Sequence, residues 1–350
     1  MTLGPLMIDL AGPAIETEER ELLRHPLVGG VILFTRNFTG SQQLASLTAS
    51  IRESRSPPLV IAVDHEGGRV QRFKAPFSLL PAARRIGQAF DLDPRAGLAL
   101  ARHMGWLMAA ELRSHGVDIS FAPCVDLDRG MSAVIGDRAL HARADAVGQL
   151  AAAYVQGMRT AGMAATAKHF PGHGAVRADS HRELPVDRRP FPDLVDDLAP
   201  YRRLIEGGLP AVMMAHVEFP EVDARPASFS SRWIRGVLRE DLHFQGAVFS
   251  DDLSMGGAAR DADIVERAER VLAAGCDVVP VCNDRAAVVS LLERLHVEPH
   301  PASQARLVRM RGRGGLPFAE LRSGAEWREA HDRLVGLAAP PLLALRPGAP

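Results

Sequence analysis

The chain has 350 residues, which is long enough for one large α/β domain or two mid-sized domains with a substantial buried core. Its 41 basic and 42 acidic residues give a formal net charge of -1, so no overall field favours nucleic acid or an anionic membrane. This balance points instead to a small or neutral binding partner.

The cysteines and the amino terminus bear on the compartment. Cys124, Cys276 and Cys282 are odd in number and lie in apolar stretches, which predicts reduced residues of the core. The amino terminus lacks a basic segment, and Asp9 interrupts its short apolar run, which argues against a secretory signal. No uninterrupted apolar stretch reaches the length that spans a membrane. Together these features predict a cytoplasmic protein.

Short apolar runs recur along the chain, each followed by a polar or glycine-rich turn and then by a longer segment with helical periodicity, as in βαβ units. The predicted strands are 6–10, 30–34, 59–63, 119–122, 164–167, 211–215, 247–250 and 277–281. Predicted crossover helices include 42–52, 97–115, 144–161, 191–206 and 263–274.

Eight parallel strands with seven crossovers fit a closed barrel better than an open doubly wound sheet, because no Gly-x-Gly-x-x-Gly turn follows the first strand. The predicted fold is therefore an α/β, single-domain (β/α)₈ TIM barrel. Residues 1–350 form one domain, in which about 295–350 supply closing helices and a tail.

Polar side chains gather where predicted strands end, and in a barrel those carboxyl ends surround the active site. They are the stretch 64–72 after the third strand, 168–174 after the fifth, His216 after the sixth and Asp251-Asp252 after the seventh. Each has a structural alternative, since Asp64 beside two glycines suits a tight turn and Asp252 suits a helix cap. Their recurrence at four strand ends favours a shared site.

The segment from Lys168 to His181 contains three histidines, two glycines and a proline, a composition that suits a shaped, movable loop. Asp179 and His181 are two residues apart, so the carboxylate could hold one imidazole nitrogen while the other faces a substrate. Such a pair could transfer protons in both directions near neutral pH. Because the loop is flanked by glycine, we expect His181 to approach Asp251 only when ligand closes the loop.

Six stretches of the chain form one set: 33–37, 64–72, 135–138, 168–174, 179–181 and 249–255. This set resembles the family 3 glycoside hydrolases, and the resemblance extends from Met7 to about Asn283. Within that family the chain is similar to the single-domain bacterial β-N-acetylglucosaminidases (β-hexosaminidases) of peptidoglycan recycling.

The resemblance implies retaining hydrolysis of terminal, non-reducing β-linked N-acetylglucosamine in peptidoglycan-derived (anhydro)muropeptides. Asp251 matches the nucleophile, which forms a covalent glycosyl-enzyme intermediate. His181 matches the general acid/base, and Asp179 matches the carboxylate that polarises it. This pair replaces the second carboxyl group of most retaining glycosidases.

Sugar binding is implied for Asp64, Arg72, Arg138, Lys168 and His169. An aspartate can accept hydrogen bonds from two sugar hydroxyls, while arginine and lysine donate to hydroxyl and acetamido oxygens. The implied partner is a small carbohydrate or muropeptide, with no cofactor, nucleic acid or membrane; the oligomeric state is not indicated.

Three positions depart from the family pattern. His65 stands where the family pattern has glutamine. Met214, just before Ala215-His216, stands where proline is usual, and Ala139, just after Arg138, stands where serine is common. None of these changes removes a proposed chemical group. They bear on the shape of the pocket and hence on the preference among aglycones.

Other enzymes are also compatible with these residues. His169, His173, His181 and His216 with nearby aspartates could bind zinc in a metal-dependent barrel hydrolase, although Lys168 would place a cation beside the metal. The same scaffold could act as an N-acetylglucosaminide phosphorylase, because a histidine acid/base does not repel phosphate as a carboxylate would.

Two further alternatives concern the role of the carboxylates. The pair Asp251-Asp252 could support substrate-assisted catalysis by the acetamido group. Consecutive residues at a strand end point in opposite directions, so Asp252 is expected to face away and brace the following turn. A non-catalytic sugar-binding barrel would need neither a nucleophile nor the Asp179–His181 pair.

Overall fold

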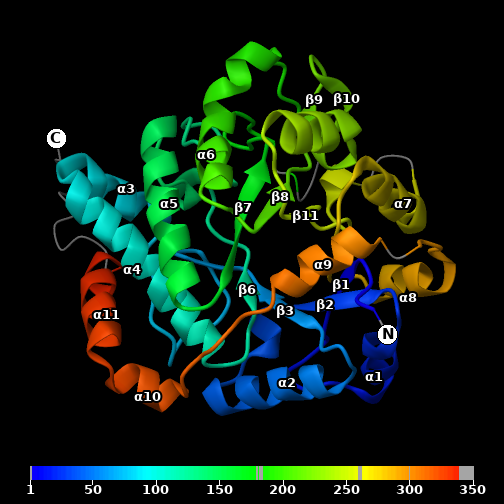
Figure 1. Cartoon of the computed structure of the whole chain (residues 1–350), viewed down its shortest axis with the longest axis horizontal. Coiled ribbons are helices and arrows are strands. Elements are labelled where there is room, and N and C mark those ends of the chain that lie inside the picture. Colours follow the sequence, from blue (N-terminus) through cyan, green and yellow to red (C-terminus); the bar gives the residue numbers. More distant parts are fainter. Residues whose placement is uncertain (1, 179, 181–183, 259–261, 299, 339–350) are drawn as a thin grey trace, which may run out of the picture.

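The structure is a computed structural model that describes residues 2–178, 180, 184–258, 262–298 and 300–338. Its centre is a nearly closed barrel of eight parallel strands with helices around it (Figure 1). The barrel strands are β1 (Leu6–Asp9), β2 (Val28–Leu33), β3 (Val60–Val63), β6 (Ile119–Ser120), β7 (Ala164–Phe170), β8 (Ala211–Met214), β11 (Ala247–Phe249) and β12 (Val279–Val281).

The barrel closes between the last two strands of the chain. Hydrogen-bonded neighbours follow the order β11-β8-β7-β6-β3-β2-β1-β12, and a bridge between Phe249 and Val278 brings the two ends together. Each of the eight predicted strands overlaps one strand of this sheet. The predicted single-domain α/β barrel is therefore confirmed.

Helices follow most of the barrel strands. The α-helices are α1 (Thr17–Arg24), α2 (Ser41–Glu53), α3 (Ala83–Leu92), α4 (Pro94–Arg113), α5 (Ala144–Thr160), α6 (Val195–Glu206), α7 (Ile264–Ala274), α8 (Arg285–Arg294), α9 (Pro301–Arg309), α10 (Phe318–Ser323) and α11 (Ala325–Ala338). A π-helical segment, Arg232–Asp241, provides the crossover between β8 and β11. Two small hairpins pair β4 (His65–Gly67) with β5 (Val70–Gln71), and β9 (Glu218–Phe219) with β10 (Asp223–Pro226).

Element boundaries differ from the prediction where local hydrogen bonds decide them. Strand β6 ends at Ser120 instead of residue 122, because the Ala122 N–H donates back to the Ser120 carbonyl at 2.8 Å. Strand β7 runs to Phe170, three residues beyond its predicted end, so Lys168 and His169 lie within the strand. Helix α4 begins at Pro94 because the Asp93 side chain caps the first turn.

The barrel strands are almost wholly buried and form one continuous apolar core with the inner faces of the helices. Gly30 in β2 allows a close approach there, since a Cβ atom would lie 2.9 Å from the Val60 carbonyl oxygen. All three cysteines are buried, as predicted, and none forms a disulfide bond within the described part of the chain. No helix in the part of the chain that the structure describes is both long and apolar enough to span a membrane.

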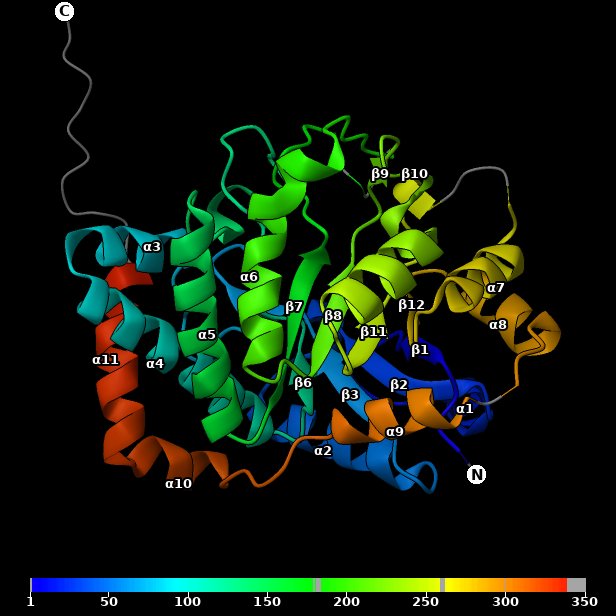
Figure 2. The same cartoon turned by 45° about the horizontal axis from the view of Figure 1, so that its top comes forward.

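The last described helix packs on the outside of the barrel against α4 (Figure 2). The Trp327 indole of α11 donates to Glu111 Oε1 at 2.9 Å, and the Ser78 hydroxyl donates to the same oxygen at 2.6 Å. Burial raises the pKa of Glu111, although these hydrogen bonds oppose the shift. The contact fastens the carboxyl-terminal segment to the barrel.

Asp118, which precedes β6, joins four parts of the fold through one buried carboxylate. Its Oδ1 accepts from Arg52 of α2 at 2.8 Å, Arg113 of α4 at 3.1 Å and the Gly312 N–H at 3.1 Å. Its Oδ2 accepts from the Ile61 N–H of β3 at 3.0 Å. Removing this side chain would leave the buried Arg113 guanidinium without its carboxylate.

Replacing Asp118 with alanine is expected to lower the free energy of unfolding by about 3–5 kcal/mol, because a buried cation loses its partner. The control is Asp145→Ala, which removes an exposed ion pair with Arg143 and should cost about 0.5 kcal/mol or less. Urea unfolding measures both. A loss of under about 1 kcal/mol for Asp118→Ala would contradict the central role of this carboxylate.

Candidate active site

A cavity of about 570 Å³ opens at the carboxyl ends of the barrel strands. Six of the site residues predicted from the sequence line it: Asp64, Arg72, Arg138, Lys168, His169 and Asp251. They come from segments after β3, after β6, within β7 and after β11, which the closed barrel brings to one mouth. Asp179 and His181 lie outside the described residues, so their predicted pairing and position stay predictions.

Lys168 lines the cavity and lies between two carboxylates. Its Nζ donates to Asp64 Oδ1 at 2.8 Å and forms an ion pair with Glu66 Oε1 at 2.6 Å. Burial would lower the pKa of this ammonium, but Asp64 and Glu66 raise it above its ordinary value. Lys168 is therefore a fixed cation, and two of its three donor positions are used within the protein.

Glu66 holds a second cation in place. Arg138 donates to it through Nη2 at 2.7 Å and through Nε at 2.9 Å, a two-point contact that fixes the guanidinium plane. Burial alone would raise the pKa of Glu66, but Arg138 and Lys168 hold it well below its usual range. Glu66 was not among the predicted site residues, although its position two residues after Asp64 was a signal for it.

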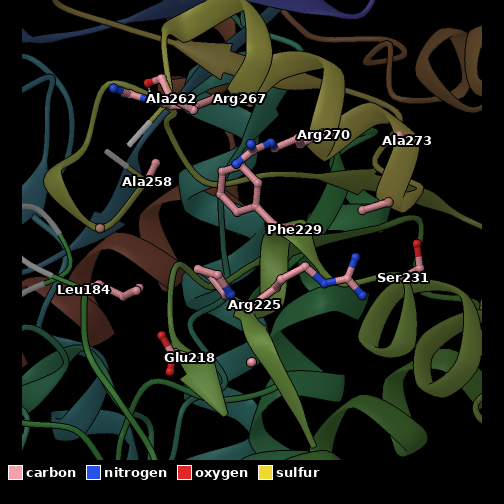
Figure 3. A pocket seen from close by; sticks show the side chains of 14 residues that line it. Leu184, Glu218, Arg225, Phe229, Ser231, Ala258, Ala262, Arg267, Arg270 and Ala273 are labelled. Atoms are coloured by element: carbon pink, nitrogen blue, oxygen red, sulfur yellow. Dashed lines mark hydrogen bonds between the residues drawn. The ribbon is translucent and has the colours of Figure 1, made fainter. Parts of the chain in front are cut away.

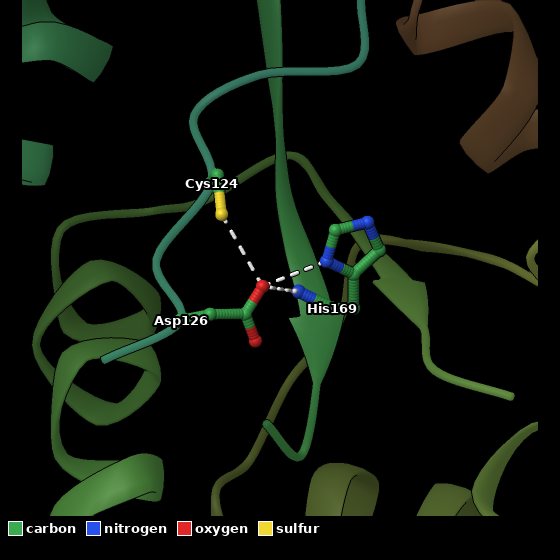
Figure 4. Close-up of side chains that lie close together, drawn as sticks. All are labelled: Cys124, Asp126 and His169. Atoms are coloured by element: carbon green, nitrogen blue, oxygen red, sulfur yellow. Dashed lines mark hydrogen bonds and ion pairs between the residues drawn. The ribbon is translucent and has the colours of Figure 1, made fainter. Parts of the chain in front are cut away.

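Asp126 lies beyond β6 and binds the segment that follows Lys168 (Figure 4). Its Oδ2 contacts His169 Nδ1 at 2.7 Å and accepts from the Cys124 thiol at 3.2 Å. Its Oδ1 accepts from the His173 N–H at 2.7 Å. Asp126 was also missing from the predicted site residues. The prediction used polar residues directly after a strand, and Asp126 lies four residues beyond the predicted end of its strand.

Asp251 and Asp252 follow β11. Asp251 is partly buried, lines the cavity and accepts from the Asp252 N–H at 2.9 Å. Asp252 accepts from the Ser254 hydroxyl at 2.7 Å and from the Cys282 N–H at 3.1 Å, so its predicted role of bracing the turn is confirmed. It nevertheless also borders the cavity instead of facing away from it, because the backbone turns directly after β11.

Metal binding was one alternative for the histidines. Among the described residues, Cys124, Asp126 and His169 have donor atoms close enough to share an ion, but Asp126 already bonds to the other two. His216 uses both ring nitrogens within the protein, with Ser228 Oγ at 2.6 Å and the Asp252 carbonyl at 3.0 Å. His216 is therefore fully engaged in hydrogen bonds, and His169 is held by Asp126 through Nδ1.

A second cavity, of about 400 Å³, lies between α7 and the β9–β10 hairpin (Figure 3). Its lining includes three arginines, each with a partner. Arg225 pairs with Asp223 at 2.8 Å, Arg270 pairs with Glu266, and Arg267 donates to backbone carbonyls. None of the predicted site residues that the structure describes lines this cavity, so we assign the chemistry to the cavity that Asp251 lines.

Burial raises the pKa of Asp252 to about 6, and the charge of Asp251 adds to the effect. A raised carboxyl pKa means that the folded protein binds the proton more tightly than the unfolded chain, so stability falls as pH rises from about 4 to 6. Between these two pH values, the free energy of unfolding of the unmodified protein should fall by about 3 kcal/mol relative to that of Asp252→Asn. Urea unfolding from pH 4 to 8 measures the difference; a constant difference would contradict it.

The family model described as the glycosyl hydrolase family 3 N terminal domain matches residues 5–310. A β-hexosaminidase from Thioalkalivibrio sulfidiphilus is 52% identical over 345 residues, which cover 99% of this chain and 99% of the relative. A β-hexosaminidase from Bordetella parapertussis is 53% identical over 316 residues, covering 90% of each.

Solved structures agree with the sequence comparison. NagZ from Neisseria gonorrhoeae, crystallised in complex with N-trifluoroacetyl-D-glucosamine, superposes with a TM-score of 0.93 at 43% identity. The superposition covers 97% of this chain and 99% of that chain. The resemblance inferred from the six motifs is thus confirmed by matches over nearly the whole length. The chain belongs to glycosyl hydrolase family 3, among the members of that family named β-hexosaminidases.

Proposed function

We propose that the protein is a retaining β-N-acetylglucosaminidase that removes terminal, non-reducing β-linked N-acetylglucosamine from peptidoglycan-derived (anhydro)muropeptides. One observation carries the proposal: Asp251 shares a cavity of about 570 Å³ with cations and carboxylates suited to sugar hydroxyls. NagZ from Neisseria gonorrhoeae binds an N-acylated glucosamine, and its fold covers nearly all of this chain. The proposed sugar is therefore N-acetylglucosamine.

In the first step the carboxylate of Asp251 attacks the anomeric carbon while His181 donates a proton to the departing glycosidic oxygen. A glycosyl ester forms on Asp251 and the aglycone leaves. In the second step His181 takes a proton from water, the water oxygen attacks the anomeric carbon, and the ester bond to Asp251 breaks. Two inversions at the same carbon give net retention.

Sugar binding is assigned to the residues around Lys168. Its ammonium uses two donors on Asp64 and Glu66, which leaves a third for a sugar oxygen. Asp64 offers acceptor oxygens, and Arg72 lies 3.8 Å from it. Because these cations are already neutralised by carboxylates, the pocket can bind a neutral sugar without attracting anions unselectively.

The muropeptide assignment also has support from charge at the mouth of the cavity. Arg69 and Arg177 line the cavity with exposed side chains. The lactyl and peptide carboxylates of a muropeptide would be suitable partners for them. We also propose a cytoplasmic location, which three buried cysteines without a disulfide bond support.

The covalent step is tested by trapping. A fluorinated N-acetylglucosaminide that slows hydrolysis of the ester should leave one glycosyl group on Asp251, identified by peptide mass spectrometry. Asp251→Asn should lose at least about 10³-fold in kcat, because the nucleophile is removed. Asp252→Asn is the matched control and should still form the adduct. Turnover without any ester at Asp251 would favour catalysis by the substrate's acetamido group.

Hydrolysis and phosphorolysis are distinguished by the product. Incubation of the protein with a defined muropeptide should release N-acetylglucosamine at a rate independent of inorganic phosphate. Chitooligosaccharides in parallel reactions test the aglycone preference. N-acetylglucosamine 1-phosphate that increases with phosphate concentration would show that the chain is a phosphorylase instead.

A further inference from the structure

Asp126 is a buried carboxylate with four hydrogen-bond donors directed at it. Its side chain has 0% relative exposure. Oδ2 accepts from the His169 backbone N–H at 3.2 Å, contacts His169 Nδ1 at 2.7 Å and accepts from the Cys124 thiol at 3.2 Å. Oδ1 accepts from the His173 backbone N–H at 2.7 Å. Both oxygens therefore accept from backbone donors that cannot reverse their role.

These donors keep Asp126 ionised. Burial would raise its pKa, but His169 and the other hydrogen bonds hold the pKa at about 2. An ionised carboxylate only accepts hydrogen bonds. The proton in the contact with His169 must therefore lie on Nδ1 of the imidazole, so the neutral ring has a bare Nε2.

The Nε2 atom of His169 is on the opposite side of the ring from Asp126 (Figure 4). His169 lines the cavity, and no hydrogen bond joins its Nε2 to any residue that the structure describes. A neutral imidazole with its proton on Nδ1 offers Nε2 as an acceptor. Lys168, Arg72 and Arg138, which line the same cavity, offer only donors.

We propose that Asp126 is a positioning residue that fixes the tautomer of His169, so that Nε2 accepts a hydrogen bond from a sugar hydroxyl. Through the His173 N–H it also anchors the start of the loop that leads to Asp179 and His181. The inference rests on the proposed glycosidase function, because the bound sugar supplies the hydroxyl. The pocket thereby offers an uncharged acceptor beside its cations.

The tautomer of His169 can be measured in the unmodified protein. In ¹⁵N-labelled protein at about pH 8.5, Nδ1 should show the shift of a protonated ring nitrogen and Nε2 that of a bare one. The His169 signals are identified by their absence in His169→Gln. A proton found on Nε2 would overturn the proposal, and this measurement needs no variant of Asp126.

Asp126→Asn tests the consequence for binding. Its carbonyl can still accept from the His173 N–H. Its amide then takes the place of Oδ2 and faces the His169 imidazole as a donor, which should move the imidazole proton to Nε2, while the weaker hydrogen bond from the His169 backbone N–H is lost. We expect kcat/KM for nitrophenyl N-acetylglucosaminide to fall about tenfold, mainly through KM, as expected for one reversed hydrogen bond. The ¹⁵N pattern of His169 should reverse with it.

Cys124→Ser is the matched control, because its hydroxyl still donates to Asp126. This variant should keep the His169 tautomer unchanged, and its KM should stay within about twofold of the unmodified protein. A folded Asp126→Asn protein with unchanged KM would refute the role of Asp126. A different result would refute the proposed function: the unmodified protein would release no N-acetylglucosamine. The two failures are thus distinguishable.

Discussion

The parallel direction of all eight barrel strands places their carboxyl ends in one ring. Residues as far apart in the sequence as Asp64, Lys168 and Asp251 consequently line one cavity. The helices on the outside bury the other faces of the strands, and the bridge between Phe249 and Val278 brings the sheet close to full closure. The position of the site follows from that closure.

Buried carboxylates then determine how the cations of the site are arranged. Glu66 holds Arg138 at two points and Lys168 at a third, while Asp126 holds the segment that follows Lys168. Each carboxylate is buried, so leaving a partner unpaired would be costly, and the geometry is correspondingly fixed. A sugar that enters meets donors and acceptors already in place, which reduces the entropic cost of binding.

The adjacent residues Asp251 and Asp252 have different surroundings in the site. Both border the cavity, but the Asp252 carboxylate accepts hydrogen bonds from Ser254 and Cys282, and burial raises its pKa to about 6. Asp252 thereby holds the turn after β11, and Asp251 is the nucleophile of the proposed mechanism. The hydrogen bonds from Ser254 and Cys282 to Asp252 create this difference.

The sequence by itself determined the order of strands and helices, since apolar periodicity and turn residues are local properties. It also determined the family, because the motifs around Lys168 and Asp251 are specific. The tertiary structure decided which residues touch: Glu66 meets Arg138 across 72 positions, and Asp126 meets His169 across 43. No local pattern encodes such pairs, because they depend on which strands become neighbours in the closed barrel.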